Sequence, residues 1–336
     1  MTLTDRLQAF VKLGLSLQAF TPEQIRDLAW QAGNANPWFD EPNVTHAFNG
    51  IIHLLDKQNL EDWIFAYDLQ QAHPRKVGVV MAGNVPMVGF HDLLCVLLAG
   101  HELYAKLSSD DTVLMKSLVG QLTGIEPEFG NRIHFVERLR DVEAIIATGS
   151  DNTSRYFEYY FSNKPHIIRR NRSSLGILTG RESAEELKAL GTDIIQYFGL
   201  GCRNVSKIFV PPGYDFTPFF EAIESLNTVA GHHKYHNNYD YNKSILLVNQ
   251  TPHLDNGFLL VTESPQLVSP ISVLFYQTYT DAYDLQQQIA AAAGKTQCLV
   301  SAQGWYKNST AFGQAQCPAV WDYADGVDTL KFLSQL

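Results

Sequence analysis

The sequence is poor in cysteine, in long apolar runs and in positive charge. Its four cysteines form no CxxC pair and no metal-ligand spacing, which argues against a metal site or a disulfide scaffold and predicts reduced thiols. No apolar run approaches the roughly 18 residues of a membrane span. The 25 basic and 35 acidic residues leave a net charge of −10, which argues against nucleic acid as the main partner. Charged residues interrupt residues 1–30, so we expect no signal peptide and a cytoplasmic protein.

The sequence does contain enough apolar residues for a large core, 45% of 336, and this length predicts two domains. Helical patterns fill residues 1–70. From a β-branched strand at residues 76–81 onward, strands and helices alternate, which is typical of an α/β protein with doubly wound parallel sheets. We expect the domain boundary near residues 180–183, a strand at 176–178 that continues the first sheet, and a further strand at 244–248.

One cysteine, Cys202, stands on a predicted turn. The helical pattern before it ends near Phe198, where Gly199 and Gly201 permit positive φ, and a short buried strand is expected after it. A structural cysteine usually lies among apolar neighbours, whereas a nucleophilic thiol needs a partly exposed, electropositive place, such as Arg203 would provide. For a lone cysteine a structural role is favoured over a nucleophilic one. Segments elsewhere in the chain are what make the nucleophilic role the better interpretation here.

Five further segments accompany Cys202 and carry a resemblance. They are Val79–Pro86 (VVMAGNVP), Tyr104–Ser109 (YAKLSS), Ile146–Ser150 (IATGS), Thr262–Pro265 with Pro270–Val273, and Phe312–Gln314 with Asp325–Phe332. Read together from about Arg75 to the C-terminus, they resemble the aldehyde dehydrogenase superfamily. The resemblance is closer to its acyl-CoA reductase branch, which includes the fatty-acid reductase of bacterial luminescence.

The resemblance implies an aldehyde-dehydrogenase-like α/β fold of two doubly wound αβα domains with an N-terminal helical segment. That superfamily binds its nicotinamide cofactor without the GxGxxG fingerprint, which is absent here. The implied division is 1–70 for N-terminal helices, 71–181 for a Rossmann-like dinucleotide-binding domain, 182–305 for a catalytic domain with the nucleophilic cysteine, and 306–336 for a closing segment.

Catalytic roles follow from the resemblance for Asn84 and Cys202. The Cys202 thiolate would attack a thioester carbonyl, and the Asn84 side chain with the Cys202 backbone N–H would hold the negative oxygen that develops. The alternative for Asn84 is that it caps the helix expected after Pro86, at residues 88–98.

Cofactor contacts are implied for Lys106, Ser108, Gly149, Ser150 and Glu263. Lys106, with help from Ser108, would contact the adenosine ribose. Gly149 and Ser150 open a helix whose N-terminus can meet a phosphate, and Glu263 would hold the nicotinamide ribose. A solvated strand-end lysine and a solvated loop carboxylate are equally open readings of Lys106 and Glu263.

Cofactor choice depends on the position of Ser109. NAD-selective members of the superfamily carry a glutamate there, which would repel a 2′-phosphate, while Lys106 would attract one. The resemblance therefore favours NADPH, although Asp110 and Asp111 nearby weigh against it.

The clearest departure from hydrolytic aldehyde dehydrogenases is at residues 168–174. Those enzymes carry a glutamate about here that activates water, whereas this chain has Arg169, Arg170 and Arg172 and no carboxylate between Glu158 and Glu182. We expect Arg169 to stand close to the glutamate's position, and surface or interdomain pairing for at least two of these arginines. An enzyme without that base should keep its acyl-cysteine intact against water.

Residues 231–241 include His232, His233 and His236 and invite a zinc interpretation. We expect a loop near the substrate entrance instead, with a solvated loop as the alternative, because metal ligands need rigid placement. No metal is expected.

The resulting hypothesis is an oxidoreductase of fatty acid metabolism that reduces an acyl-CoA or acyl-protein thioester to an aldehyde with NADPH, through an acyl-cysteine. The alternatives are an acylating aldehyde dehydrogenase that runs the other way, and a catalytically idle homologue that acts as a binding subunit. The expected partners are the acyl-CoA or acyl-carrier substrate and further copies of the chain in a homo-oligomer.

Overall fold

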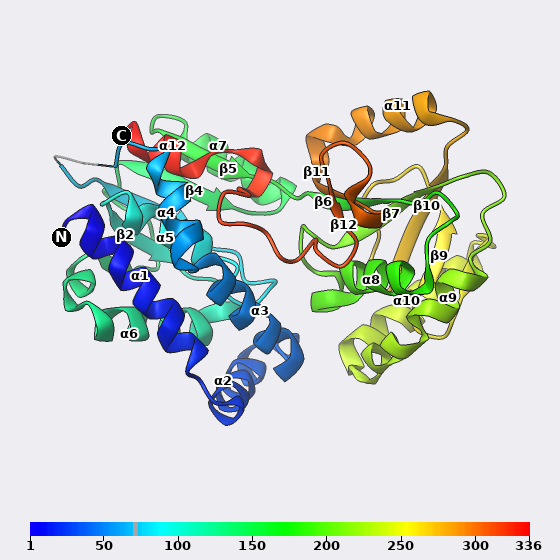
Figure 1. Ribbon diagram of the computed structural model, residues 1–336, viewed down its shortest axis with the longest axis horizontal. Coiled ribbons are helices and arrows are strands. Elements are labelled where there is room, and N and C mark those ends of the chain that lie inside the picture. The colour runs from blue at the N-terminus through cyan, green and yellow to red at the C-terminus, as the bar shows by residue number, and fades with distance from the viewer. Residues whose placement is uncertain (70–72) are drawn as a thin grey trace. The chain divides into compact units, whose positions relative to one another are not determined.

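A computed structural model describes residues 1–69 and 73–336, and these form two compact units (Figure 1). Unit 1 comprises Met1–Asn171 and Pro318–Leu336, and unit 2 comprises Arg172–Cys317. The chain thus crosses between units before the boundary expected near residues 180–183, because β6 (Ser173–Ile177) pairs with strands of the second sheet. The expected boundary at residues 70–71 lies outside the described residues.

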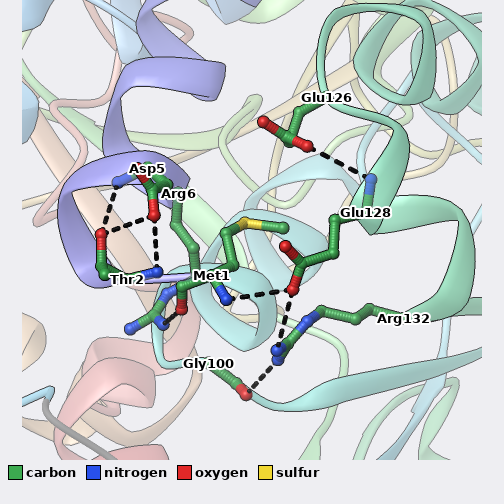
Figure 2. Close-up of polar contacts among 8 residues, drawn as sticks. All are labelled: Met1, Thr2, Asp5, Arg6, Gly100, Glu126, Glu128 and Arg132. Carbon is green, nitrogen blue, oxygen red and sulfur yellow. Dashed lines mark hydrogen bonds and ion pairs between the residues drawn. The ribbon is translucent and has the colours of Figure 1, made fainter.

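Unit 1 begins with amphipathic helices whose starts are fixed by side-chain caps. Thr21 and Gln24 form a capping box at the start of the second helix, and Thr2 and Asp5 form another at the start of the first, seen in Figure 2. The same view shows Arg132 donating to the carbonyl oxygen of Gly100, next to the start of the second strand. The first helix packs against the third and the sixth. The helices are α1 (Leu3–Gln18), α2 (Pro22–Ala35), α3 (Glu41–Leu54), α4 (Lys57–Phe65), α5 (Phe90–Leu98), α6 (Thr112–Ile125), α7 (Asp151–Phe161) and α12 (Thr329–Ser334).

The five-stranded sheet of unit 1 is parallel and has the order β3-β2-β1-β4-β5. The chain runs outward from β1 through β2 to β3 and then returns to the other side of β1 with β4. The carboxyl ends of β1 and β4 therefore form a topological switch point, where open α/β sheets bind ligands. The strands are β1 (Lys76–Val80), β2 (Glu102–Lys106), β3 (Ile133–Phe135), β4 (Ala144–Thr148) and β5 (His166–Arg169).

Unit 2 is built on a seven-stranded sheet of order β12-β11-β6-β7-β10-β9-β8, parallel except for β8. Its core packs the buried side chains of Leu175, Ile177 and Phe209 against Leu285. The remaining strands are β7 (Val205–Val210), β8 (Leu254–Asp255), β9 (Leu260–Glu263), β10 (Val273–Thr278), β11 (Thr296–Ser301) and β12 (Ser309–Ala311), and the helices are α8 (Ala184–Ile195), α9 (Thr217–Ile223), α10 (His233–Val248) and α11 (Ala282–Ala292).

Three sequence predictions in unit 2 are wrong, and two of them concern α10. Residues 233–241 of the loop expected at 231–241, and the whole strand expected at 244–248, lie in this one helix. Its buried side chains Tyr235, Tyr239 and Asn242 recur at helical spacing, so the buried face is aromatic and polar and gives no aliphatic periodicity. The strand at 176–178 is real but belongs to the second sheet as β6. No helix among the described residues is long and apolar enough to cross a membrane.

Candidate active-site residues

The turn after β1 lies at the switch point of unit 1 and carries Asn84. The Met81 N–H donates to the Lys106 carbonyl at 3.0 Å, so the ends of β1 and β2 are joined there. Asn84 is exposed on the turn, and Lys106 is the exposed last residue of β2. The helix after the turn begins at Phe90 with Gly89 as its N-cap and no side-chain cap, so the alternative role of Asn84 as a helix cap is wrong.

Gly83 brings this turn directly against Ser108. A Cβ at Gly83 would lie 2.6 Å from both Cβ and Oγ of Ser108, a distance that allows only glycine. The Ser108 Oγ also accepts from the Asp110 N–H at 3.3 Å and caps the short 3₁₀ segment Ser109–Asp111. The structure therefore places Asn84, Lys106 and Ser108 at one edge of the sheet, and gives Ser108 a structural role there.

Asp111 is a buried residue that supports the same turn, a structural role that the sequence analysis did not predict. Its side chain is 3% exposed, and Oδ2 accepts from the Met87 N–H at 2.6 Å. Burial raises the pKa of this carboxyl to about 8. Oδ1 is buried and has no hydrogen-bond partner among the described residues. An uncharged acid thus lies beneath the Asn84 turn at neutral pH.

Gly149 and Ser150 lie at the neighbouring strand end, as predicted. Ser150 is the N-cap of α7, and its Oγ accepts from the Thr153 N–H at 3.3 Å. A Cβ at Gly149 would lie 3.0 Å from atoms of Thr153 and Phe157, so a bare backbone is favoured there. The amide groups of the first turn of a helix form an anion-binding position, and that turn follows β4 at the switch point.

In unit 2, Cys202 follows a strained turn. Tyr197, Phe198 and Gly199 all have positive φ, at 52°, 57° and 77°. Each non-glycine residue in this region costs on the order of 1–3 kcal/mol, which the burial of both rings helps to offset. Gly199 ends the helical segment as expected, while Gly201 is outside the positive-φ region. Cys202 is exposed on the turn that follows.

Asn204 holds this turn together, a role that no pattern in the sequence indicated. Its Nδ2 donates to the carbonyls of Asp193, Ile194 and Gln196 at 3.1, 3.3 and 2.7 Å, at the end of α8. Its Oδ1 accepts from the Gly201 N–H at 2.7 Å. One buried amide therefore ties the helix end to the backbone just before Cys202.

Asp193 and Arg203 join the same turn to residues 313–315. The Asp193 carboxylate, 1% exposed, accepts from the Gly313 and Ala315 N–H groups at 2.7 and 3.0 Å. Burial raises the pKa of Asp193 to about 6, against the effect of those two donors. Arg203 donates to the Ala315 carbonyl at 3.5 Å, so its guanidinium stays near the turn.

The other cysteines are poorly suited to nucleophilic attack. Cys95 is fully buried, and burial raises the pKa of its thiol well above the ordinary value. Burial also raises the thiol pKa of Cys298 and of Cys317. A raised thiol pKa lowers the fraction of reactive thiolate at neutral pH.

Glu263 does not lie with the Cys202 turn. It is the exposed last residue of β9. Its register partner in β10 is Tyr276, and the register partner of Tyr276 in β7 is Ile208. The three residues from Val205 to Ile208 alone span about 10 Å along the strand, away from Cys202. The returning segment 269–272 does reach the turn and lines, with Phe198, Asn204 and other residues, a cavity of about 20 Å³.

The arginines of residues 168–174 all have structural partners. Arg169 is 5% exposed and pairs with Asp92 through Nη1 at 2.6 Å, and its Nη2 donates to Thr329 Oγ1 at 2.8 Å, all within unit 1. Arg170 pairs with Glu158. Arg172 donates to a backbone carbonyl in unit 2. Arg169 therefore has a structural role in the core of unit 1. In unit 2, the Ser174 side chain of β6 contacts the Cys202 turn.

The histidines near residue 232 form no metal centre. His232 is the N-cap of α10 and accepts from the Tyr235 N–H at 3.4 Å. Within residues 1–69 and 73–336, no group of three or more His, Cys, Asp or Glu side chains could hold a metal ion.

Comparison with known proteins places the fold. No protein-family model and no curated protein matches the sequence. Solved structures do match: KauB, an aldehyde dehydrogenase from Pseudomonas aeruginosa, has a TM-score of 0.64 and 14% identity over 90% of this chain and 72% of its own. An E. coli NADP-dependent enzyme has a TM-score of 0.67 and 13% identity over 90% and 73%.

A third structure is P. syringae AldA, an indole-3-acetaldehyde dehydrogenase C302A mutant in complex with NAD+ and IAA. It has a TM-score of 0.66 and 12% identity over 94% of this chain and 75% of its own. At identities this low, the comparison shows that the folds are alike and does not show that the activities are the same. The expected fold class is confirmed: the chain has an aldehyde-dehydrogenase-like α/β fold with two parallel-stranded units.

Proposed function

We propose that this protein is an NADPH-dependent reductase that converts an acyl-CoA or acyl-carrier thioester to an aldehyde through an acyl group on Cys202. The observation that carries the proposal is the exposed Cys202 thiol on a turn fixed from both sides, in an aldehyde-dehydrogenase-like fold. The structural neighbours include an NAD+ complex and an enzyme described as NADP-dependent, which supports an oxidoreductase acting on aldehydes.

The chain's own residues would act in two stages. The Cys202 thiolate attacks the thioester carbonyl, the carbon–sulfur bond to CoA breaks, and CoA leaves as its thiol after taking a proton. Asn84 and the Cys202 backbone N–H hold the oxyanion. The cofactor, when bound, supplies a hydride to the acyl carbon. The thiohemiacetal then collapses, which releases the aldehyde and restores the Cys202 thiolate.

The switch point of unit 1 suits the cofactor. The bare backbone at Gly149, the first turn of α7 and the exposed Lys106 supply a close approach, amide donors and a cation for a phosphate-rich ligand. Lys106 would contact the adenosine ribose and Ser150 a phosphate. Ser108 supports the turn beside them.

The choice between hydrolysis of the acyl-cysteine and its reduction rests on the chemistry around Cys202. The side chains that hold its turn are the neutral Ser174 and Asn204. The nearby Asp193 carboxylate is buried, and both its oxygens accept backbone hydrogen bonds. None of these groups offers a free carboxylate that could activate water. Hydrolysis of the acyl-cysteine should therefore be slow, and the acyl group should persist until it is reduced by hydride.

The test is to mix the protein with NADPH and a panel of acyl-CoAs and follow loss of nicotinamide absorbance. Cys202→Ala should abolish both this loss and any acyl adduct seen by intact mass. Cys317→Ser is the matched control because Cys317 is also exposed, and it should retain activity. An acyl adduct that forms on the Cys202→Ala protein would refute the assignment.

The same residues would also serve an acylating aldehyde dehydrogenase that runs from aldehyde and CoA to acyl-CoA. A panel of aldehydes with NADP+ and CoA, followed by absorbance gain, separates the directions by their rates. An idle homologue would give neither signal while still binding cofactor.

A further inference from the structure

Ser174 links two cysteines through one buried hydroxyl. Its Oγ donates to the Cys202 carbonyl oxygen at 3.1 Å and lies 2.9 Å from the Cys298 Sγ. The Ser174 side chain is fully buried. Because its single proton goes to the carbonyl, the Cys298 thiol must be the donor to Ser174. The result is a directed chain from the Cys298 S–H through Ser174 to the backbone of Cys202.

Both strands beside Ser174 are irregular at this point. On one side, Ser174 pairs with Val205 and Leu175 with Lys207, so Ser206 is an extra residue in β7. On the other side, the register with β11 also shifts, between Thr296 and Leu299, where Cys298 lies. Bulges re-aim side chains and are enriched next to active sites. Here they flank the residue whose hydroxyl reaches the Cys202 turn.

We propose that Ser174 is a positioning residue that fixes the backbone of Cys202 for attack on a carbonyl, with Cys298 as the donor that holds Ser174 in place. The inference rests on the proposed function, in which Cys202 is the nucleophile. Asn204 fixes the Gly201 N–H ahead of Cys202, and Ser174 fixes the Cys202 carbonyl after it. The Asn204 N–H also donates to the Gly201 carbonyl at 3.1 Å, in the peptide group that carries the Cys202 N–H, so both peptide groups of the nucleophile are held.

This role predicts a separation between two reactions of the same thiol. Acyl transfer needs the Cys202 N–H at about 3 Å from the developing oxyanion, and a misplacement of about 1 Å can cost about 10²-fold in rate. Alkylation by iodoacetamide displaces iodide at a saturated carbon and forms no oxyanion. Loss of Ser174 should slow the first reaction and spare the second, whereas general damage to the unit would slow both.

The experiment uses 4-nitrophenyl acetate as acyl donor, so it does not depend on the physiological substrate. The Cys202 thiolate attacks the ester carbonyl, the carbon–oxygen bond breaks, 4-nitrophenolate leaves, and the acetyl group stays on Sγ. Single-turnover release of nitrophenolate and the rate of iodoacetamide alkylation are measured on the full chain, with Cys202 modification confirmed by peptide mass. The variants are Ser174→Ala, Ser174→Thr and Cys298→Ser.

Ser301→Ala is the matched control. Ser301 is a fully buried serine of β11 whose Oγ pairs with Ser309 and accepts from the Tyr306 N–H, so it loses similar bonds elsewhere in unit 2. Ser174→Ala should lower the acetylation rate by about 10²-fold with alkylation unchanged. Ser174→Thr and Cys298→Ser keep a donating hydroxyl and should remain near the wild-type rate. The control should alter neither rate.

Equal loss of both reactions in Ser174→Ala, or unchanged acetylation, would overturn the inference. If that variant does not fold, Cys298→Ala provides the test. It removes the hydrogen bond from Cys298 to Ser174, which should slow acetylation about fivefold and leave the alkylation rate unchanged. Failure of the wild type to be acetylated at Cys202 would also overturn it. Acetylation without any turnover of acyl-CoA and NADPH would instead refute the proposed function and leave the role of Ser174 standing.

Discussion

Asp111 accepts a 2.6 Å hydrogen bond from the backbone N–H of Met87, a non-glycine residue held at φ 57°. Met87 lies in the turn that carries Asn84, so a buried acid supports the backbone of a proposed catalytic group. The contact joins the carboxyl end of β1 to the 3₁₀ segment after β2. In the sequence, Asp111 was only a charge near the proposed 2′-phosphate position.

The first prediction concerns pH. Burial raises the pKa of Asp111 to about 8, so the folded chain keeps a proton that the unfolded chain releases near pH 4. The free energy of unfolding of unit 1 should therefore fall as pH rises from about 4 to about 8. Asp111→Asn, which carries no titrating proton, should flatten this decline.

Urea unfolding at pH 5, 6, 7 and 8, followed by tryptophan fluorescence, measures it. Asp193 contributes a similar decline only up to its pKa of about 6, and burial lowers the pKa of His46 and of His101, which gives a rise in stability up to about pH 6.5. The interval from pH 7 to 8 is therefore the one assigned to Asp111. Asp110→Asn, at an exposed neighbour, is the control. An Asp111→Asn slope equal to that of the wild type would contradict the prediction. Unit 1 contains Trp30, Trp38, Trp63 and Trp321.

The second prediction concerns the buried ion pair of Arg169 and Asp92. Removing one partner leaves an uncompensated charge, so Arg169→Met should destabilise unit 1 by about 3–5 kcal/mol. The double variant Arg169→Met with Asp92→Leu should recover much of that loss. Arg170→Met breaks an exposed pair and should cost about 0–1 kcal/mol. Unfolding midpoints check all three, and equal effects at positions 169 and 170 would be inconsistent with the burial of the pair.

The third prediction concerns cofactor choice. Lys106 ends β2 exposed, and Ser109 lies in the segment that follows, so the proposed function gives tighter binding of NADPH than of NADH. Ser109→Glu should narrow or reverse that preference, because a carboxylate repels a 2′-phosphate. Fluorescence titration of both cofactors measures it, with Ser109→Gln as the uncharged control of similar size. Tighter NADH binding by the wild type would disprove the 2′-phosphate hypothesis.

The first strand, one helix start and the fold class could be predicted because their signals are local. Val77, Val79 and Val80 form a β-branched run, and the Thr21–Gln24 capping box fixes a helix start within four residues of sequence. The α10 helix was not predicted because its buried face consists of tyrosine and asparagine side chains. Such side chains bury through hydrogen bonds, as Tyr235 does to the Phe258 carbonyl, and give no apolar period.

The supports of the proposed site could not be predicted because their partners are distant in the chain. Ser174 and Cys298 are separated by 124 residues, and Asp193 and Gly313 by 120. Arg169 was expected near the position of a hydrolytic glutamate from its place in the sequence alone. The chain crosses from unit 1 to unit 2 right after it, between Asn171 and Arg172, and the contacts of Arg169 with Asp92 and Thr329 lie within unit 1.

The last prediction concerns the lifetime of the acyl group on Cys202. General-base help is typically worth about 10²–10⁴ in rate, and the neutral Ser174 and Asn204 that hold the turn cannot supply it. The acyl-enzyme formed without cofactor should therefore persist, and then give aldehyde when NADPH is added. Arg169→Glu should not shorten its lifetime, because a second carboxylate beside Asp92 would destabilise unit 1 instead.

The measurement is to load the protein with a labelled acyl-CoA, remove the excess and time the release of label as free acid. Asp193→Asn tests a buried carboxylate near the turn. Because backbone donors engage both of its oxygens, it should not act on water, and the variant should release acid no more slowly. Release as acid within seconds by the wild type would mean that another carboxylate activates water. If Asp193→Asn then abolished that release, Asp193 would be the base and the enzyme a hydrolytic dehydrogenase.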